Sequence, residues 1–181
     1  MEKIKCLFTR NFNTGIVFDE VTQGCEWVAS GDGWATLKHD GTSCMFRDNK
    51  FYKRRMVKKG KKAPSRFIPC TYDENTGKTF GWVPVDPDDP VNKYHMIALG
   101  DGGWGNGTYE LVGPKINGNS DHHPEYMLLK HGAISYDGVP RRFDALAAWF
   151  KGKDIEGLVF YNKAGDMVKI KKGDFGMGRE E

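Results

Sequence analysis

Lys38 has an unusual place in this sequence, because it lies near the end of a run that otherwise has the apolar pattern of a buried strand, Trp34–His39. The pair Asp40-Gly41 follows, and a second apolar run begins at Ser43. Asp-Gly between two such runs predicts a β-hairpin turn. Lysine is normally kept at the surface, so this placement indicates an amine that points into a pocket and takes part in chemistry. The tetrapeptide Lys38-His39-Asp40-Gly41 in isolation is typical of a lysine at the exposed edge of a sheet. Other parts of the sequence are needed to choose between a surface lysine and a reactive one.

The elements that position this lysine are mostly predicted strands, since short runs of β-branched and aromatic residues alternate with turn residues. The predicted strands are Lys5–Phe8, Ile16–Phe18, Glu26–Ser30, Trp34–His39, Ser43–Arg47, Phe51–Met56, Thr79–Pro84, Tyr109–Val112, Glu125–Lys130, Leu158–Tyr161 and Met167–Lys171. Two helices are predicted: Val91–Leu99 behind the N-cap pair Asp89-Pro90, and Arg142–Lys151, whose apolar side chains recur with helical spacing. The pattern predicts an α+β fold.

The length of 181 residues, with 39% hydrophobic and 28% charged residues, predicts a single soluble domain spanning residues 1–181. No apolar run is long enough to cross a membrane, and the N-terminus lacks the apolar core of a signal peptide. The four cysteines lie far apart without a C-x-x-C pair, which argues against a zinc site and favours reduced thiols. We therefore expect no membrane partner and a cytoplasmic location, or the host cytosol if the source is viral. The oligomeric state is left open, with a monomer favoured.

Charge is unevenly distributed, although the net charge is only +3. All the charged residues between Lys50 and Arg66 are lysines or arginines. Such a block is typical either of a solvated loop or of a surface that binds a phosphate backbone. Its candidate nucleic-acid-binding residues are Lys53, Lys58, Lys59, Lys61, Lys62 and Arg66.

Five segments, in order along the chain, resemble a known set of motifs: Lys38-His39-Asp40-Gly41, Arg54-Arg55, Tyr109-Glu110-Leu111-Val112-Gly113-Pro114-Lys115-Ile116-Asn117-Gly118-Asn119, Ile155-Glu156-Gly157-Leu158-Val159-Phe160 and Met167-Val168-Lys169-Ile170-Lys171. The covalent nucleotidyltransferase superfamily of RNA ligases, DNA ligases and mRNA capping enzymes carries the same order: K-x-D-G, an arginine, a glutamate on a strand, E-G-hydrophobic-V and K-x-K. Thr42-Ser43-Cys44 and His131-Gly132 are similar to the small ATP-dependent RNA ligases related to the vertebrate 5′-to-3′ RNA ligase.

This resemblance implies a nucleotidyltransferase core, an ATP-grasp-like ligase fold of antiparallel sheets with a few flanking helices. It also implies a three-step reaction that joins 5′-phosphate and 3′-hydroxyl RNA ends with ATP and Mg²⁺ or Mn²⁺. A lysine amine attacks the α-phosphate and releases pyrophosphate, AMP passes to the 5′-phosphate end, and the 3′-hydroxyl then displaces AMP. The amine has to be neutral to attack, and partial burial and nearby cations favour that form.

The resemblance also implies roles for individual residues. Lys38 is the expected nucleophile, with Leu37 beside it in the nucleotide pocket, and Asp40 is expected to serve the strand-joining steps. Glu156 is the expected Mg²⁺ ligand, with Glu110 as a second candidate, because carboxylates supply the hard oxygen that Mg²⁺ prefers.

Other residues are expected to hold the nucleotide. Glu110 is suited to accept from ribose hydroxyls, and Arg55, with Arg54 as the adjacent candidate, offers a donor fork. Lys169 and Lys171 alternate along a strand, so both lie on one face, as two phosphate-facing cations must. Adenine is expected to stack on a flat side chain, and the residues that follow the glutamate motif offer two candidates, Tyr126 and His131.

One departure from the family pattern and two alternatives accompany this interpretation. The chain ends soon after Lys171, so we expect no C-terminal OB-fold, which weakens the capping-enzyme and DNA-ligase readings. A GTP-dependent RNA guanylyltransferase is one alternative. The other is a catalytically inactive nucleic-acid-binding module of the same fold, which the intact set of lysines and glutamates argues against.

Overall fold

A computed structural model describes residues 3–180 of the chain, and these form two compact units. The five-stranded unit contains Ile4–His39 and residues 132–180, and the six-stranded unit contains Asp40–His131 together with Lys3. Most strand pairs in both units are antiparallel and the helices are few, which confirms the predicted α+β class. Among the helices within 3–180, none is long and apolar enough to cross a membrane.

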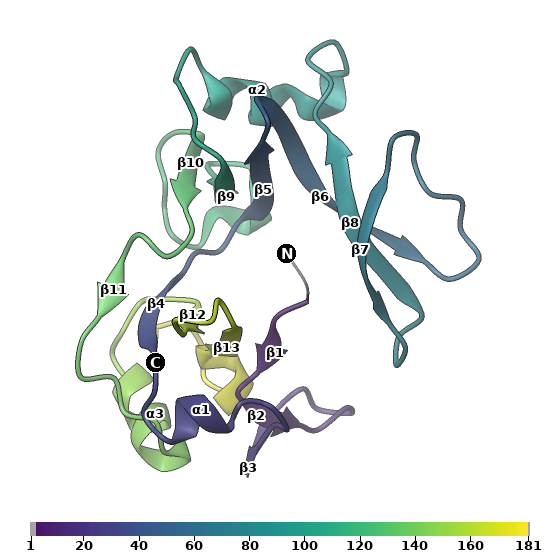
Figure 1. Cartoon of the computed structure of the whole chain (residues 1–181). Helices are drawn as coiled ribbons and strands as arrows, with labels where there is room; N and C mark the ends of the chain where they lie inside the picture. The colour runs from purple at the N-terminus through teal and green to yellow at the C-terminus, as the bar shows by residue number, and fades with distance from the viewer. Residues whose placement is uncertain (1–2, 181) are drawn as a thin grey trace. The chain divides into compact units, whose positions relative to one another are not determined.

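The five-stranded unit is built on a sheet with the strand order β1-β13-β12-β4-β11 (Figure 1). Only β1 and β13 pair in parallel. The strands are β1 (Lys5–Cys6), β4 (Trp34–Lys38), β11 (Ser135–Tyr136), β12 (Gly157–Tyr161) and β13 (Met167–Lys171). A hairpin of β2 (Phe8–Arg10) and β3 (Val17–Val21), the helices α1 (Glu26–Ala29) and α3 (Phe143–Phe150) and the 3₁₀ turn η3 (Lys172–Phe175) complete the unit.

One face of this sheet forms the core of the five-stranded unit. Alternate residues of β12 and β13, including Leu158 and Ile170, are fully buried and pack with Leu146 and Phe150 of α3. Because side chains alternate along a strand, the intervening residues lie on the opposite face. The residues on that face are Thr36, Lys38, Val159, Lys169 and Lys171. The hydrophobic core therefore fixes the strands that carry the lysines.

The six-stranded unit has the fully antiparallel order β10-β9-β5-β6-β8-β7. Its strands are β5 (Thr42–Arg47), β6 (Lys50–Lys58), β7 (Ile68–Asp73), β8 (Lys78–Pro84), β9 (Gly107–Val112) and β10 (Met127–Lys130). The 3₁₀ turn η1 (Pro90–Asn92), the helix α2 (Lys93–Leu99) and the 3₁₀ turn η2 (Asn117–Asn119) lie in its connections. A long loop joins β6 to the edge strand β7 (Figure 1).

The sheet of the six-stranded unit has two different faces. We call one the helix face, because its residues pack with Ala98 and Tyr94 of α2; these residues are Cys44, Phe46, Phe51, Tyr109 and Leu111. We call the other the Glu110 face; by strand register it carries Glu110, Ser43, Met45, Tyr52, Arg54 and Trp82. A smaller cluster of Met45, Tyr52 and Trp82 lies on the Glu110 face.

The predicted hairpin at Asp40-Gly41 is wrong. Strand β4 pairs with β11 and β12, whereas β5 pairs with β6 and β9, so Asp40-Gly41 links two different sheets. Gly41 is required for another reason: a Cβ atom there would collide with the Leu111 carbonyl oxygen and lie 2.7 Å from Glu110 Cγ. The Asp-Gly sequence thus serves a close approach of the chain to β9.

Other predicted elements agree with the structure to different degrees. The segment Glu26–Ser30 was predicted as a strand but contains helix α1, and the strands β7 and β11 were not predicted. The Asp89 cap is confirmed, since its carboxylate accepts from the Val91 N–H at 3.0 Å, although η1 precedes α2. Helix α3 confirms the prediction of an amphipathic helix before Glu156.

Candidate functional site

Strand register brings Lys38 and Lys171 into one row of the five-stranded sheet. Gly157 on β12 lies opposite Lys38 on β4 and opposite Lys171 on β13. Residues directly opposite each other in antiparallel strands lie on the same face. A Cβ atom at Gly157 would collide with the Ile170 carbonyl oxygen and lie 2.8 Å from Lys171 Cα, so glycine is needed here. The two lysines therefore face each other with no side chain between them.

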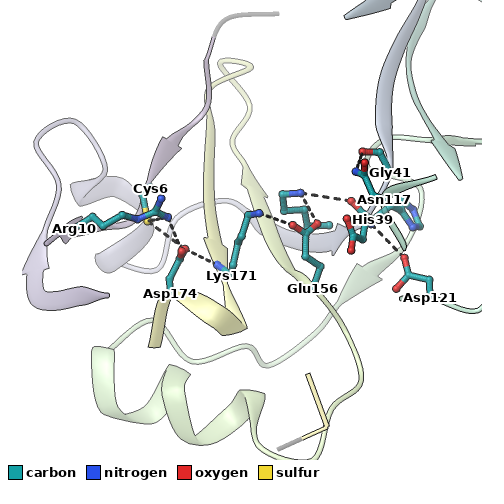
Figure 2. Close-up of polar contacts among 11 residues, drawn as sticks. Cys6, Arg10, His39, Gly41, Asn117, Asp121, Glu156, Lys171 and Asp174 are labelled. Atoms are coloured by element: carbon teal, nitrogen blue, oxygen red, sulfur yellow. Dashed lines mark hydrogen bonds and ion pairs between the residues drawn. The ribbon is translucent and has the colours of Figure 1, made fainter. Parts of the chain in front are cut away.

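Glu156 joins these two lysines through its carboxylate. Its Oε2 lies 2.5 Å from Lys38 Nζ, and its Oε1 lies 2.6 Å from Lys171 Nζ. Figure 2 shows the Lys171 and Glu156 side chains pointing toward each other. The Glu156 side chain is only 14% exposed, so water screens these ion pairs less than it would at the surface. This arrangement holds the predicted nucleophile against an acceptor for its proton.

Lys169 adds a third amine on the same face. It lies two residues before Lys171, opposite Val159. Burial lowers the pKa of Lys169, and the charges of Lys38, Lys171 and Arg10 lower it further. These neighbouring cations repel one another, and an anion such as a phosphate that bound among them would reduce this repulsion.

Asp174 holds the Lys171 backbone and the Arg10 side chain in place, and it was not among the site residues predicted from the sequence. Its carboxylate accepts from the Lys171 backbone N–H at 2.9 Å and from the Arg10 guanidinium at 2.5 Å. The Cys6 thiol lies 3.5 Å from the same carboxylate, and this proximity, after burial, raises the pKa of Cys6 (Figure 2). An acid three residues after Lys171 has capping-box spacing, which could have indicated Asp174. No local pattern points to Arg10.

In the six-stranded unit, Glu110, the expected ribose acceptor, contacts His131, one of the two adenine candidates. His131 Nε2 lies 2.7 Å from Glu110 Oε2, and His131 Nδ1 lies 2.9 Å from Thr108 Oγ1. The Glu110 side chain is 11% exposed. One oxygen of the Glu110 carboxylate contacts His131, and the other oxygen can accept a hydrogen bond from a ligand hydroxyl.

The adjacent arginines Arg54 and Arg55 point to opposite faces of the six-stranded sheet. Arg54 lies opposite Trp82, on the Glu110 face, and its guanidinium carbon is 5.0 Å from the centre of the Trp82 ring. Arg55 lies opposite Gly81, on the other side, and is exposed. The structure therefore places Arg54, and not the first-choice Arg55, on the face that carries Glu110.

Ser43 lies between Glu110 and Arg54 on this face. It is opposite Glu110 in β9, and its neighbour Cys44 is opposite Lys53, which puts Ser43 next to Arg54. The Ser43 hydroxyl is buried and has no hydrogen-bond partner within residues 3–180. Buried polar atoms are nearly always bonded, so this hydroxyl is suited to a ligand group.

The two adenine candidates lie in different surroundings. Tyr126 stacks on Tyr94 of α2 with ring centres 4.4 Å apart, and it packs with the cluster of the helix face. The next strand residues alternate, so Met127 and Leu129 lie on the Glu110 face. His131, bonded to Glu110, is the candidate that the structure brings to that face.

The remaining predicted residues are placed as follows. Leu37 lies in β4, and the Asp40 backbone N–H donates to the Asp121 carboxylate at 3.2 Å. Lys53 donates to the Asn92 side chain at 2.5 Å and is held against η1. The other basic candidates are exposed at the end of β6 and in the loop that follows: Lys58, Lys59, Lys61, Lys62 and Arg66.

Comparison with known proteins relates part of the chain to a protein family. A family model described as RNA ligase 1 matches residues 103–179, which include Glu110, Glu156, Lys169 and Lys171 but not Lys38. No curated protein matches the chain at a significant level. The matched segment contains the carboxylate and the two strand lysines that surround Lys38. Over residues 103–179 the chain is therefore related to the RNA ligases.

Proposed function

We propose that this protein is an ATP-dependent RNA ligase that joins 5′-phosphate and 3′-hydroxyl ends through an AMP group carried on Lys38. One observation carries the proposal: the Lys38 amine lies 2.5 Å from the Glu156 carboxylate in a group that also contains Lys169 and Lys171. The relationship to RNA ligases supports the RNA substrate.

The first step requires the Lys38 amine to lose a proton. Glu156 is the carboxylate within reach of that proton, and a positioned base of this kind contributes roughly 10²–10⁴-fold to a rate. The neutral amine attacks the α-phosphorus of ATP, a phosphorus–nitrogen bond forms, the bond to pyrophosphate breaks, and the nitrogen loses its second proton to solvent. Lys169 and Lys171 stabilise the negative charge on the phosphate and on the leaving group.

The later steps transfer AMP and seal the strand. A 5′-phosphate oxygen attacks the phosphorus on Lys38, the phosphorus–nitrogen bond breaks, and the amine is restored. The 3′-hydroxyl of the second strand then attacks the activated 5′-phosphate, releases AMP and loses its proton to solvent.

A magnesium ion fits this group of residues through Glu156. Within residues 3–180 no group of three or more His, Cys, Asp or Glu side chains could hold a metal ion by itself. Mg²⁺ is commonly held by one or two carboxylates together with substrate phosphates, so Glu156 would act together with the ATP phosphates, with one of its oxygens exchanged from its lysine partner to the ion. When bound, the ion would neutralise charge on the transferred phosphate.

Residues of the Glu110 face are proposed to hold the nucleoside. Glu110 accepts from a ribose hydroxyl, and Arg54 donates to a ribose or phosphate oxygen. The unpaired hydroxyl of Ser43 lies between them in the strand row and gains a partner when the nucleoside binds.

Intact-mass measurement tests the proposal directly. The purified protein is incubated with ATP and Mg²⁺, and we expect a mass increase of one AMP in the wild type and none in Lys38→Ala. Lys151→Ala, which removes an exposed lysine after α3, is the matched control and should label fully. Replacing ATP with GTP separates an adenylyltransferase from a guanylyltransferase. An unlabelled, folded wild type would refute the ligase mechanism and favour a nucleic-acid-binding module.

A further inference from the structure

The side of the six-stranded sheet that carries Arg55 presents aromatic and basic side chains that the nucleotide chemistry does not use. Arg55 and Val57 alternate along β6 and so point the same way, and Lys59 lies in the turn after β6. Tyr72 on β7 and Phe67, which directly precedes β7, add two aromatic rings. We call these five residues, Arg55, Val57, Lys59, Phe67 and Tyr72, the Arg55 platform.

Strand register joins the platform residues into two adjacent rows. Arg55 lies opposite Gly81, and Val57 lies opposite Thr79, which in turn lies opposite Tyr72. Gly81 has no side chain, and the Phe67 ring occupies the space: a Cβ atom at Gly81 would lie 2.6 Å from Phe67 Cζ. One aromatic ring therefore lies next to Arg55, and the second lies in the following row.

Lys59 extends the platform past the end of β6. Its aliphatic stem lies over Gly77 in the β7–β8 turn, where a Cβ atom would be 3.2 Å from Lys59 Cβ and Cδ. Arg55 precedes Lys58, the last residue of β6, by three strand positions, which corresponds to about 10 Å along the strand, and Lys59 follows Lys58. The two cations are thus separated along the strand direction, with the row of Val57, Thr79 and Tyr72 between them.

The platform is accessible. Tyr72 is 54% exposed, and Arg55 and Lys59 are exposed. The helix α2 covers the same side only near Phe51 and Lys53, where His95 contacts the Phe51 ring and Asn92 accepts from Lys53. Asp73, the acid next to Tyr72, alternates to the other side and pairs with Lys3 at 2.6 Å. The platform therefore combines one exposed ring, Tyr72, and one half-buried ring, Phe67, with positive charge, and it has no carboxylate among its members.

We infer that the Arg55 platform binds single-stranded RNA, with bases stacked on Tyr72 and Phe67 and phosphates held by Arg55 and Lys59. An aromatic ring can stack only on a base whose face is free, which excludes a paired duplex. Charge complementarity selects a polyanion, and the adjoining loop supplies Lys61, Lys62 and Arg66. The inference deepens the proposed function and rests on it only for the identity of the bound strand as a ligase substrate.

Fluorescence polarisation with a labelled 12-nucleotide oligouridine, without ATP, tests the inference. Tyr72→Ala should weaken binding about tenfold, the size of one lost stacking contact, and Tyr72→Phe should restore it. Arg55→Ala should reduce the slope of log K against log salt by about 0.7, the value for one phosphate on a single strand. Two exposed residues of the other unit provide matched controls: Phe12→Ala, at a ring that is 91% exposed, and Lys163→Ala should bind as the wild type does.

Several results would contradict the inference that the Arg55 platform binds single-stranded RNA. Unchanged binding by Tyr72→Ala, equal weakening by Phe12→Ala, or competition by duplex RNA as strong as by single strands would each contradict it. Labelling of the wild type with ATP is measured separately. If the wild type fails to label and Tyr72→Ala loses RNA binding, the ligase mechanism is refuted and RNA binding by the platform is supported. If the wild type labels and Tyr72→Ala binds RNA as the wild type does, the ligase mechanism is supported and RNA binding by the platform is refuted.

Discussion

The two units of this protein arrange the charged residues of their candidate sites in different ways. In the five-stranded unit, charges are in direct contact: one carboxylate, Glu156, touches two lysine amines, and Lys169 is close enough for their charges to lower its pKa. In the six-stranded unit, Glu110 and Arg54 are separated across the sheet by Ser43; Glu110 contacts the His131 ring, and the Arg54 guanidinium lies over the Trp82 ring.

This difference indicates a division of labour. Charges in contact can exchange a proton and stabilise a phosphate whose charge is changing, which is what a chemical step needs. Separated polar groups on a sheet face can orient a ligand without reacting with it. The comparison predicts that changes in the first group reduce the rate of labelling, whereas changes in the second group reduce the affinity for nucleotide.

Glu156→Gln should have the largest effect. The amide cannot accept the Lys38 proton and leaves the cluster of lysines without its shared anion, so the rate of AMP transfer to Lys38 should fall about 1,000-fold. Single-turnover labelling followed by mass measures this rate. Glu74→Gln, at an exposed position in the β7–β8 turn, should label at the wild-type rate. A Glu156→Gln protein within tenfold of wild type would show that the contact of charges is not what drives the chemistry.

Asp174→Asn should have the next largest effect. The amide keeps the shape but loses the charge that holds Arg10 and the Lys171 backbone, so the labelling rate at saturating ATP should fall about tenfold through lost orientation. Asp174→Glu, which keeps the charge, should recover part of the rate. A lower melting temperature with an unchanged rate would restrict Asp174 to a structural role.

Arg54→Ala should act on affinity and not on rate. Removing a charged donor from the Glu110 face should raise the ATP KM about tenfold with a smaller change in the maximal labelling rate. The charge-matched comparison is Arg55→Ala, since Arg55 is adjacent in sequence and lies on the other side of the sheet. An equal rise in ATP KM for Arg55→Ala would contradict the assignment of the two faces.

His95 should make the six-stranded unit sensitive to mild acid, the smallest of these effects. Burial, with the nearby charge of Lys53, lowers the pKa of His95 to about 4, and both ring nitrogens are without partners within residues 3–180. The unfolded chain takes up a proton on this ring below about pH 6.5 and the folded chain only near pH 4. The free energy of unfolding should therefore decrease as the pH falls through this window.

After discounting for the partial exposure of the ring, we expect this decrease to be about 1–2 kcal/mol. Urea unfolding at pH 7 and pH 5 measures it, and His95→Leu should show a smaller difference between the two pH values. An equal pH dependence in His95→Leu would assign the effect to other groups.

The sequence by itself determined the features that depend on neighbours in the chain. Strand alternation correctly put Lys169 and Lys171 on one face, the apolar spacing predicted helix α3, and Asp89 was identified as a cap. The order of motifs indicated the relationship to RNA ligases, which the match to residues 103–179 supports.

Only the tertiary structure decided which strands pair and in what register. Asp40-Gly41 has the local pattern of a hairpin, but a turn sequence does not fix the partner of a strand, and β4 pairs with β12. The choice between Arg54 and Arg55 depends on register, because a shift of one residue moves a side chain to the other face. Arg10 reaches Asp174 across 164 positions, a contact that no local pattern encodes. Local propensities act over a few residues, whereas the site is assembled by hydrogen bonds and burial between segments far apart in the chain.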